Sequence, residues 1–299
     1  MEFRSIFISN PAQLSARREQ LVIRQAQEVT VPMEDITSLM LESQAVTISS
    51  AALQKLADHG VTVYFCDEKH MPAALLLPIN RHSRQLRALK GQIAMTKPAQ
   101  KRIWQSVVIA KIRNQAECLK LLKRPGTDDL LELASRVRSG DPDNCEAAAA
   151  AQYFPSLFGQ GFTRGDDSLS NAALNYGYAI LRGAVARNLA VHGMEPCLGI
   201  FHHSELNQFN LADDLMEPYR PLVDLYVASA VREEEEDLTP QLKQQLFNLT
   251  NYLVRQDGKR YRMISAIGRM AESFSRAVAQ NAAVLELPEL IALEPYRYE

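Results

Sequence analysis

The chain has 299 residues, and 46% of them are hydrophobic, so it can bury a sizeable core and is not a largely disordered protein. Its 33 Lys and Arg residues stand against 35 Asp and Glu residues, and this net charge of −2 gives no general preference for a polyanionic partner. The four cysteines form no Cys-x-x-Cys pair, which excludes a zinc ribbon and a dithiol redox motif and fits a reducing, cytoplasmic location. We expect no signal peptide and no membrane span.

Short hydrophobic runs rich in Val, Ile and Phe dominate the first 78 residues, and polar or turn residues separate them. This pattern is typical of β-strands. The predicted strands are 3–8, 21–23, 29–31, 36–41, 46–48 and 61–65. One helix is expected over 51–59, because Ser49 or Ser50 can cap its start and Gly60 can end it. We therefore predict a small β-rich N-terminal domain over 1–80.

From residue 81 onward the hydrophobic residues recur every three to four positions, which predicts helices. The predicted helices are 84–94, 97–122, 127–138, 142–154, 170–192, 210–230, 240–255 and 260–285. Pro72, Pro78 and Asn80 mark the junction. The chain is therefore predicted to be an α+β protein, in which an all-helical domain over 81–299 follows the β-rich domain.

Positive charge is concentrated in the segment 81–124, which carries twelve Lys and Arg residues and one acid, Glu117. The net charge of this basic segment is therefore +11, and the rest of the chain carries −13. A solvated helix face is the plain explanation, but so concentrated a field is also typical of a surface that neutralises phosphates. Arg81, Arg84 and Arg87 recur every third residue and are the predicted nucleic-acid contacts.

Two acids and two histidines lie close together in the sequence. Asp214 and Glu217 are three residues apart and so share one helix face. The proline directly after Glu217 then kinks or breaks that helix. With His202 and His203 upstream, these oxygen and nitrogen donors suit a divalent metal ion. The plain alternative is that Asn210 caps the helix and the acids only favour its positive end.

Glu146 is a third acid with an informative setting. It lies near the start of a predicted helix, where Asp141 can act as the N-cap and Pro142 as the first residue, so it could be an ordinary acid of the first turn. Five alanines follow it directly, and such a thin helix wall lets neighbouring helices approach closely. A carboxylate inside such an assembly needs a partner. A metal ion held together with His202 and Glu217 would supply one.

Five short stretches of the sequence are informative through their order along the chain and the spacing between them. They are FISNPA (7–12), VPMEDI (31–36), GVTVYFCD (60–67), LGIFHH (198–203) and NQFNLADDLMEPYRPLVD (207–224). Together with Glu146 and the alanines after it, these stretches resemble the Cas1 family, the integrase subunit of CRISPR systems, and most of all its type II version. Each stretch is weak alone, but together they are specific, and the resemblance extends over essentially the whole chain.

The resemblance implies a metal-dependent DNA endonuclease and integrase with a β-rich N-terminal domain and a helical catalytic domain. The catalytic metal ligands, carried over residue by residue, are Glu146, His202 and Glu217. His203 is the alternative histidine ligand, although the Gly-x-x-His spacing in LGIFHH favours His202. Asp214 stands where some family members have a further carboxylate near the metal.

The resemblance also implies a cofactor and partners. The cofactor would be Mg²⁺ or Mn²⁺, acting as Lewis acid and template when a DNA 3′-hydroxyl is joined to a phosphodiester. The partners would be double-stranded DNA, as prespacer and as repeat array, and the small Cas2 subunit. We expect a homodimer with the β-rich domain as its interface, and no association with a membrane.

Two other classes of function remain open at this point. A non-catalytic DNA-binding scaffold would use the basic segment and leave the acids structural, and nuclease assays with Mn²⁺ would distinguish it from an enzyme. A helical carboxylate-bridged metal oxidase is suggested by His202-x-x-Glu205. That fold usually carries Glu-x-x-His in two copies, whereas here the order is reversed and the motif single.

Overall fold

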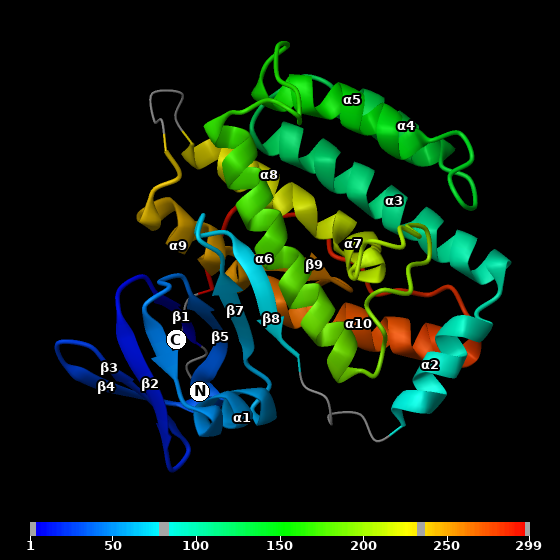
Figure 1. Ribbon diagram of the computed structural model, residues 1–299. Coiled ribbons are helices and arrows are strands. Elements are labelled where there is room, and N and C mark those ends of the chain that lie inside the picture. Colours follow the sequence, from blue (N-terminus) through cyan, green and yellow to red (C-terminus); the bar gives the residue numbers. More distant parts are fainter. Residues whose placement is uncertain (1–3, 78–83, 232–236, 297–299) are drawn as a thin grey trace.

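The computed structural model describes residues 4–77, 84–231 and 237–296 (Figure 1). Strands make up most of the N-terminal part and helices most of the remainder, which confirms the predicted α+β class. The predicted domain division at residue 80 lies outside the described residues and stays a prediction.

The N-terminal part is built from eight described strands, one α-helix and a 3₁₀ turn at Met33–Asp35. The strands are β1 (Arg4–Ile8), β2 (Ala12–Arg17), β3 (Gln20–Arg24), β4 (Glu28–Pro32), β5 (Ile36–Leu41), β6 (Val46–Ile48), β7 (Thr62–Cys66) and β8 (Pro72–Leu76), and α1 (Ser50–Asp58) precedes β7. They form two sheets, with strand orders β1-β5-β7-β8 and β4-β3-β2-β6. Of the two serines predicted as possible caps, Ser49 is the one that caps α1, by accepting a hydrogen bond from the N–H of Ala52.

Strands β2 and β8 are absent from the predicted strands. In β2 the buried Ala12 and Leu14 alternate with exposed residues, but neither is β-branched, so the usual compositional signal is missing. The sequence of β8 is Pro-Ala-Ala-Leu-Leu, whose Ala and Leu favour helices, and it becomes a strand by antiparallel pairing with β7. In both cases the pairing with a neighbouring strand outweighs local propensity.

Helices fill most of the chain after residue 84. They are α2 (Gln85–Ala94), α3 (Lys97–Leu121), α4 (Thr127–Arg136), α5 (Cys145–Phe158), α6 (Leu169–Val191), α7 (Asn210–Met216), α8 (Arg220–Ala230), α9 (Pro240–Asn248) and α10 (Met263–Gln280). Among the described residues, none of these helices is long and apolar enough to cross a membrane.

The prediction of an all-helical domain is wrong at residues 253–262, where a β-hairpin lies between α9 and α10. Its strands are β9 (Leu253–Gln256) and β10 (Lys259–Arg262), which pair antiparallel. The two turn residues, Asp257 and Gly258, both have positive φ angles, 51° and 71°. Two such residues form the tight turn that matches the twist of a hairpin, and Asp-Gly is one of its preferred sequences.

Helix α6 lies between the N-terminal sheets and the other helices (Figure 1). Gly183 allows its close approach to β7, because a Cβ atom at this position would lie only 2.4 Å from Cε1 of Tyr64. The Tyr64 hydroxyl donates a hydrogen bond of 2.8 Å to the carbonyl oxygen of Ile180, also on α6. The buried tyrosine thus fixes the strands to the helical part.

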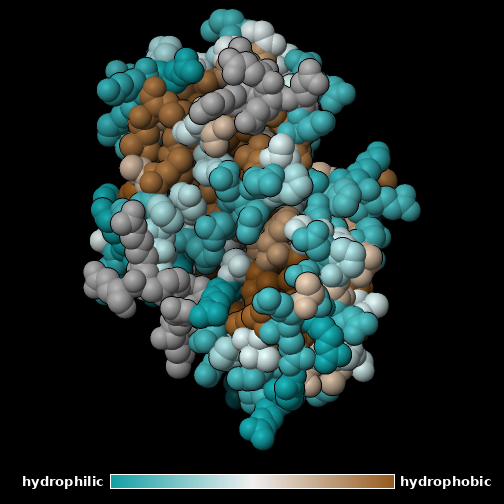
Figure 2. All heavy atoms as spheres, turned by 90° about the vertical axis from the view of Figure 1, so that its left-hand side faces the viewer, coloured by the Kyte–Doolittle hydropathy of each residue, from teal (hydrophilic) through white to brown (hydrophobic). Residues whose placement is uncertain are grey.

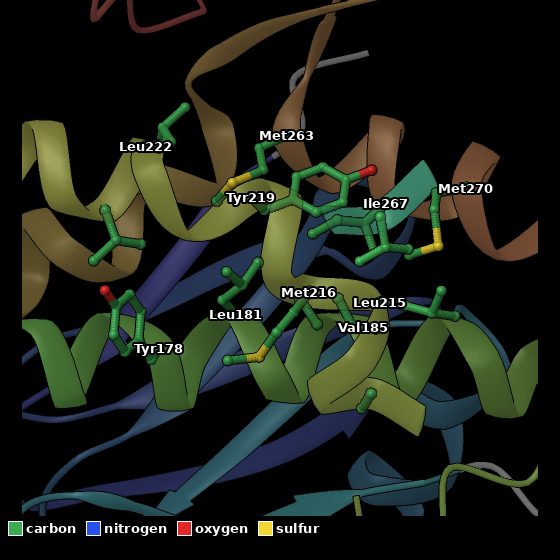
Figure 3. Close-up of a cluster of buried hydrophobic side chains, with 14 of the residues drawn as sticks. Tyr178, Leu181, Val185, Leu215, Met216, Tyr219, Leu222, Met263, Ile267 and Met270 are labelled. Carbon is green, nitrogen blue, oxygen red and sulfur yellow. The ribbon is translucent and has the colours of Figure 1, made fainter. Parts of the chain in front are cut away.

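Side chains from α6, α7, α8 and α10 meet in one buried cluster (Figure 3). Leu181 and Val185 project from α6, Met216 is the last residue of α7, and Ile267 and Met270 come from α10. Each of these side chains is at most 1% exposed. Because such close-packed helices move little relative to one another, the cluster holds the segment 210–220 in a fixed position.

Asp224 joins α8 to two neighbouring helices. Its carboxylate is buried and accepts hydrogen bonds from the hydroxyls of Tyr153 on α5, at 3.0 Å, and Tyr178 on α6. Burial raises the pKa of Asp224 from 3.8 to about 6, although the two tyrosine hydrogen bonds act in the opposite direction.

This raised pKa makes the contribution of Asp224 to stability depend on pH. The folded protein binds the carboxyl proton more tightly than the unfolded chain, so the contribution is complete below pH 4 and is lost as the pH rises through about 6. We expect the difference in unfolding free energy between the native protein and Asp224→Asn to fall by up to about 3 kcal/mol over this range. Urea denaturation between pH 4 and pH 7 measures it, and a difference independent of pH would contradict the assignment.

Candidate metal centre

Glu146 is positioned by the start of α5. The helix begins at Cys145 and not at residue 142 as predicted, and Asp141 adopts a positive φ of 49° instead of a standard N-cap conformation. Its carboxylate nevertheless accepts hydrogen bonds from the N–H groups of Cys145, at 2.9 Å, and Glu146, at 3.0 Å. Asp141 thus fixes the first turn of the helix, from which the Glu146 side chain extends toward α3.

Glu217 is positioned by the predicted break in the helix of segment 210–230. The α-helix α7 ends at Met216, a 3₁₀ turn covers Glu217–Tyr219, and α8 begins at Arg220. Pro218 lacks an N–H donor, which explains why the regular helix cannot continue there. Glu217 is only 4% exposed, so this buried carboxylate requires a positive partner.

The partner of both acids is Lys111, from the middle of α3. Its Nζ lies 2.6 Å from Oε1 of Glu146 and 2.6 Å from Oε2 of Glu217. On the other side of Glu217, Nε of Arg220 lies 3.0 Å from Oε1. The side chain of Lys111 is 11% exposed. The structure therefore brings Glu146 and Glu217 together around an ammonium group.

Charges in this cluster decide the protonation of its members. Burial alone would raise the pKa of Glu217, but the positive charges of Arg220 and Lys111 outweigh burial and hold its pKa below the usual value. Burial alone would lower the pKa of Lys111, and the charges of Glu217 and Glu146 again outweigh it, so this pKa is raised. Both groups are therefore charged at neutral pH.

His202 lies in the loop between α6 and α7 and is held by Asp214. The Nδ1 atom of His202 lies 2.6 Å from Oδ1 of Asp214, which is fully buried. The same carboxylate accepts hydrogen bonds from the N–H groups of Ile200, Phe201 and His202. With four donors, Asp214 has little capacity left for a metal, so its geometry favours a role in orienting His202.

Gly199 allows the loop to fold over Asp214. A Cβ atom at this position would lie 2.1 Å from the carbonyl oxygen of His202, which no side chain could tolerate. Asn210 closes the loop from the other side. It is the first residue of α7 and not its predicted N-cap, and its side-chain NH₂ group donates to the carbonyl oxygens of Cys197, Ser204 and Asn207.

Aromatic rings fix the plane of the His202 imidazole. Trp104 stacks on Phe201, with ring centroids 4.2 Å apart, and its edge contact with His202 has a centroid distance of 5.9 Å. The hydrogen bond to Asp214 raises the pKa of His202, and the charges of Glu217 and Glu146 act in the same direction. Because Nδ1 is engaged by Asp214, Nε2 is the nitrogen that neutral His202 can offer to a metal.

His203 and Glu205 lie away from this cluster. Both are exposed and line a separate cavity of about 450 Å³ between the loop and α2. The structure thus separates the two histidines, with His202 oriented by Asp214 and His203 on the surface. Glu205, which the oxidase alternative requires, does not approach Glu146 or Glu217 in this arrangement.

All but one of the described Lys and Arg residues of the basic segment are exposed. Arg84 and Arg87 are exposed and border a groove between α2 and α10, while Arg81 lies outside the described residues. The other described Lys and Arg residues of the segment are exposed too, except Lys111. Lys111 is therefore wrongly included in the predicted surface charge. Its signal was the helical spacing to the buried Val107 and Val108, four and three residues earlier on the same helix face.

The donor set fits a divalent cation. The cluster offers two carboxylates and one imidazole nitrogen, which suit Mg²⁺ or Mn²⁺ better than a thiol-binding metal. Among the described residues, Oε2 of the buried Glu217 has no polar partner other than Nζ of Lys111, 2.6 Å away. No three His, Cys, Asp or Glu side chains of the described residues stand close enough to hold a metal, and the ammonium of Lys111 lies between the two acids.

Comparison with known proteins identifies the family of the chain. The family model described as CRISPR associated protein Cas1 matches residues 6–260. A CRISPR-associated endonuclease Cas1 from Neisseria meningitidis serogroup C (strain 8013) is 45% identical over 307 residues, which cover 100% of both chains.

Solved structures show the same fold. A casposase bound to integration product is 20% identical, with a TM-score of 0.76 over 95% of this chain and 92% of the other. A Cas6-RT-Cas1–Cas2 complex is 16% identical, with a TM-score of 0.70 over 94% of this chain and 35% of the other.

Proposed function

Since the chain belongs to the CRISPR-associated Cas1 family, we propose that it is a divalent-metal-dependent DNA endonuclease and integrase that joins short duplexes to a repeat array. The similarity to the Neisseria endonuclease over the full length of both chains supports this activity. The single structural observation that carries the proposal is the convergence of Glu146 and Glu217 on one cationic group, with His202 oriented beside them.

In the proposed mechanism, Glu146, Glu217 and Nε2 of His202 would hold the metal ion. When bound there, Mg²⁺ or Mn²⁺ would supply Lewis acidity for the phosphate. Asp214 keeps the His202 ring in one orientation and directs its proton to Nδ1. Arg220 keeps Glu217 ionised, because its guanidinium remains positive at any accessible pH.

Strand joining is a transesterification in this proposal. The oxygen of a DNA 3′-hydroxyl forms a bond to phosphorus, the bond from phosphorus to the leaving 3′-oxygen breaks, and the proton lost by the nucleophile is balanced by one gained by the leaving group. The half-buried position of the cluster beside an exposed basic face gives the phosphate a route to it.

Double-stranded DNA, a Cas2 subunit and a second copy of the chain are the proposed partners. The structural relative whose name includes Cas1 and Cas2 supports the second of these. On the face shown in Figure 2, hydrophobic side chains gather in two areas separated by a hydrophilic band, and the lower area lies at the height of the β-rich part. Contiguous apolar surface of this kind is typical of contact sites, which supports a dimer through the β-rich part.

A strand-joining assay tests the proposal. The purified protein, with its Cas2 partner and Mn²⁺, is given a short labelled duplex and a plasmid that carries the repeat. We expect joined products that require the metal and disappear with a chelator. Binding of the duplex without cleavage or joining at any metal concentration would instead support the DNA-binding scaffold.

Arg84 and Arg87 are the proposed phosphate contacts within the described residues. Replacing both with alanine should weaken duplex binding about equally for all sequences and reduce the salt slope of log K by about 1.8, since each lost phosphate contact removes about 0.9. Filter binding or fluorescence anisotropy over a salt series measures this slope.

Arg17 and Arg24 provide the matched control. Both are exposed arginines of the N-terminal strands, outside the basic segment, and they share one ion-pair partner, Glu28, which leaves a net charge of only +1. Their double alanine variant should leave the slope unchanged. An unchanged slope in the Arg84 and Arg87 variant would place the DNA-binding surface elsewhere.

A further inference from the structure

Lys111 is the one described basic residue of the segment 84–124 that is withdrawn from the surface. It stands between Glu146 and Glu217, with both contacts at 2.6 Å, and its side chain is only 11% exposed. A buried lysine of this kind loses hydration, which only its two carboxylate partners compensate. Glu217 has Arg220 as a second cationic partner, whereas no ion pair other than that with Lys111 is found for Glu146 among the described residues.

A divalent cation bound by the same two acids would need the space that Lys111 fills. Mg²⁺ lies about 2.1 Å from its ligand oxygens and demands near-octahedral geometry. The Nζ atom already lies 2.6 Å from one oxygen of each acid, so the two positions overlap. Two cations in one place also repel each other strongly in a partly buried site. Lys111 and the divalent cation are therefore mutually exclusive at these oxygens.

We propose that Lys111 is a built-in counter-ion, which neutralises Glu146 and Glu217 until a divalent cation displaces it, and thereby sets the affinity of the site for that cation. The inference rests on the proposed function, since it takes these two acids as metal ligands. The lysine side chain suits the role, because its compact charge sits on a flexible four-carbon stem that can withdraw without moving α3.

Binding of Mn²⁺ alone, measured by electron paramagnetic resonance at fixed pH and salt, tests the inference without any activity assay. Lys111→Met removes the competitor and keeps the length of the stem. We expect its Kd for Mn²⁺ to fall at least about tenfold. In the native protein Lys111 occupies the site in most molecules, and only the fraction without it can bind Mn²⁺, which weakens the apparent affinity. Glu217→Gln should raise the Kd at least about tenfold.

Lys243 gives a matched control. It is another buried lysine in an ion pair, with Nζ 3.4 Å from Oε1 of Glu42, in a part of the molecule remote from the site. Lys243→Met should leave the Kd for Mn²⁺ unchanged. If Lys111→Met leaves the Kd unchanged while Glu217→Gln raises it, the inference is overturned and the proposed metal site stands. If Glu217→Gln has no effect either, the proposed metal site itself fails.

Chemical labelling of the unmodified protein covers the case in which Lys111→Met does not fold. Reductive methylation followed by mass spectrometry reports how accessible each lysine is. With saturating Mg²⁺ we expect the labelling rate of Lys111 to rise at least about fivefold, because the displaced ammonium enters solvent. The rate for Lys243 should not change. Equal protection of Lys111 with and without Mg²⁺, at concentrations where Mg²⁺ is bound, would overturn the inference.

Discussion

Replacing Glu217 with glutamine is expected to lower DNA cleavage and strand joining by about 10³-fold or more. The amide keeps the size of the side chain but has no charge to hold a cation, and stabilisation of the developing phosphate charge is worth several kcal/mol, each 1.36 kcal/mol being tenfold in rate. Glu146→Gln should have an effect of the same order, since it removes the other carboxylate from the same cluster. The strand-joining assay with Mn²⁺ measures both.

Glu42→Gln controls for the cost of removing a buried acid. The Glu42 side chain is 6% exposed, against 5% for Glu217, and it too contacts a lysine, Lys243. Breaking either ion pair should lower the unfolding free energy by about 3 kcal/mol, which circular dichroism during urea denaturation reports. Only the Glu217 variant should lose activity. A folded Glu217→Gln protein that joins DNA at the native rate would refute the proposed mechanism.

Local chemistry made part of the site predictable from the sequence. The proline after Glu217 predicts the end of a regular helix, and the structure has a 3₁₀ turn there, directly after α7. Asp141 was predicted to fix the start of α5, and its carboxylate does so, although from a left-handed conformation that shifts the helix start to Cys145. Such signals depend on a few neighbouring residues, so sequence can reveal them without knowledge of the fold.

The hairpin at 253–262 was also within reach of the sequence. Asp257-Gly258 is a strong turn signal, but apolar residues on both sides also fit a helical period, which led to the wrong prediction of helices there. The short run of β9 carries the buried Leu253 and Val254, and such brief apolar runs do not distinguish strand from helix by periodicity alone.

The role of Lys111 could not be predicted in the same way. Its charge is indistinguishable in sequence from that of exposed neighbours such as Arg113, and only the packing of α5 and the Glu217 turn against α3 removes it from water. The resemblance to Cas1 proteins named Glu146, His202 and Glu217, but it did not name the group that stands between the acids. Helical spacing can indicate that Lys111 faces the core, but its position between the two acids follows only from the tertiary structure.

His202→Ala is expected to lower cleavage and joining by about 10²-fold or more, because the change removes the only imidazole that the structure orients beside Glu146 and Glu217 among the described residues. Asp214→Asn should have a smaller effect, about 10-fold to 100-fold, since it leaves the ring in place but weakens the hydrogen bond that orients it. The Kd for Mn²⁺ should rise in both variants, and more in His202→Ala than in Asp214→Asn.

His203→Ala is the matched control for His202→Ala, because it removes the neighbouring histidine from the same loop. His203 is exposed and lines the separate cavity beside α2, so its loss should change activity by no more than about twofold, as for most surface substitutions. The pair of variants decides between the two histidines with folding and loop composition nearly constant. An inactive His203→Ala protein beside an active His202→Ala protein would reverse the assignment, and it would require the loop to turn over when DNA and metal bind, since Gly199 and Asp214 hold it in the opposite orientation here.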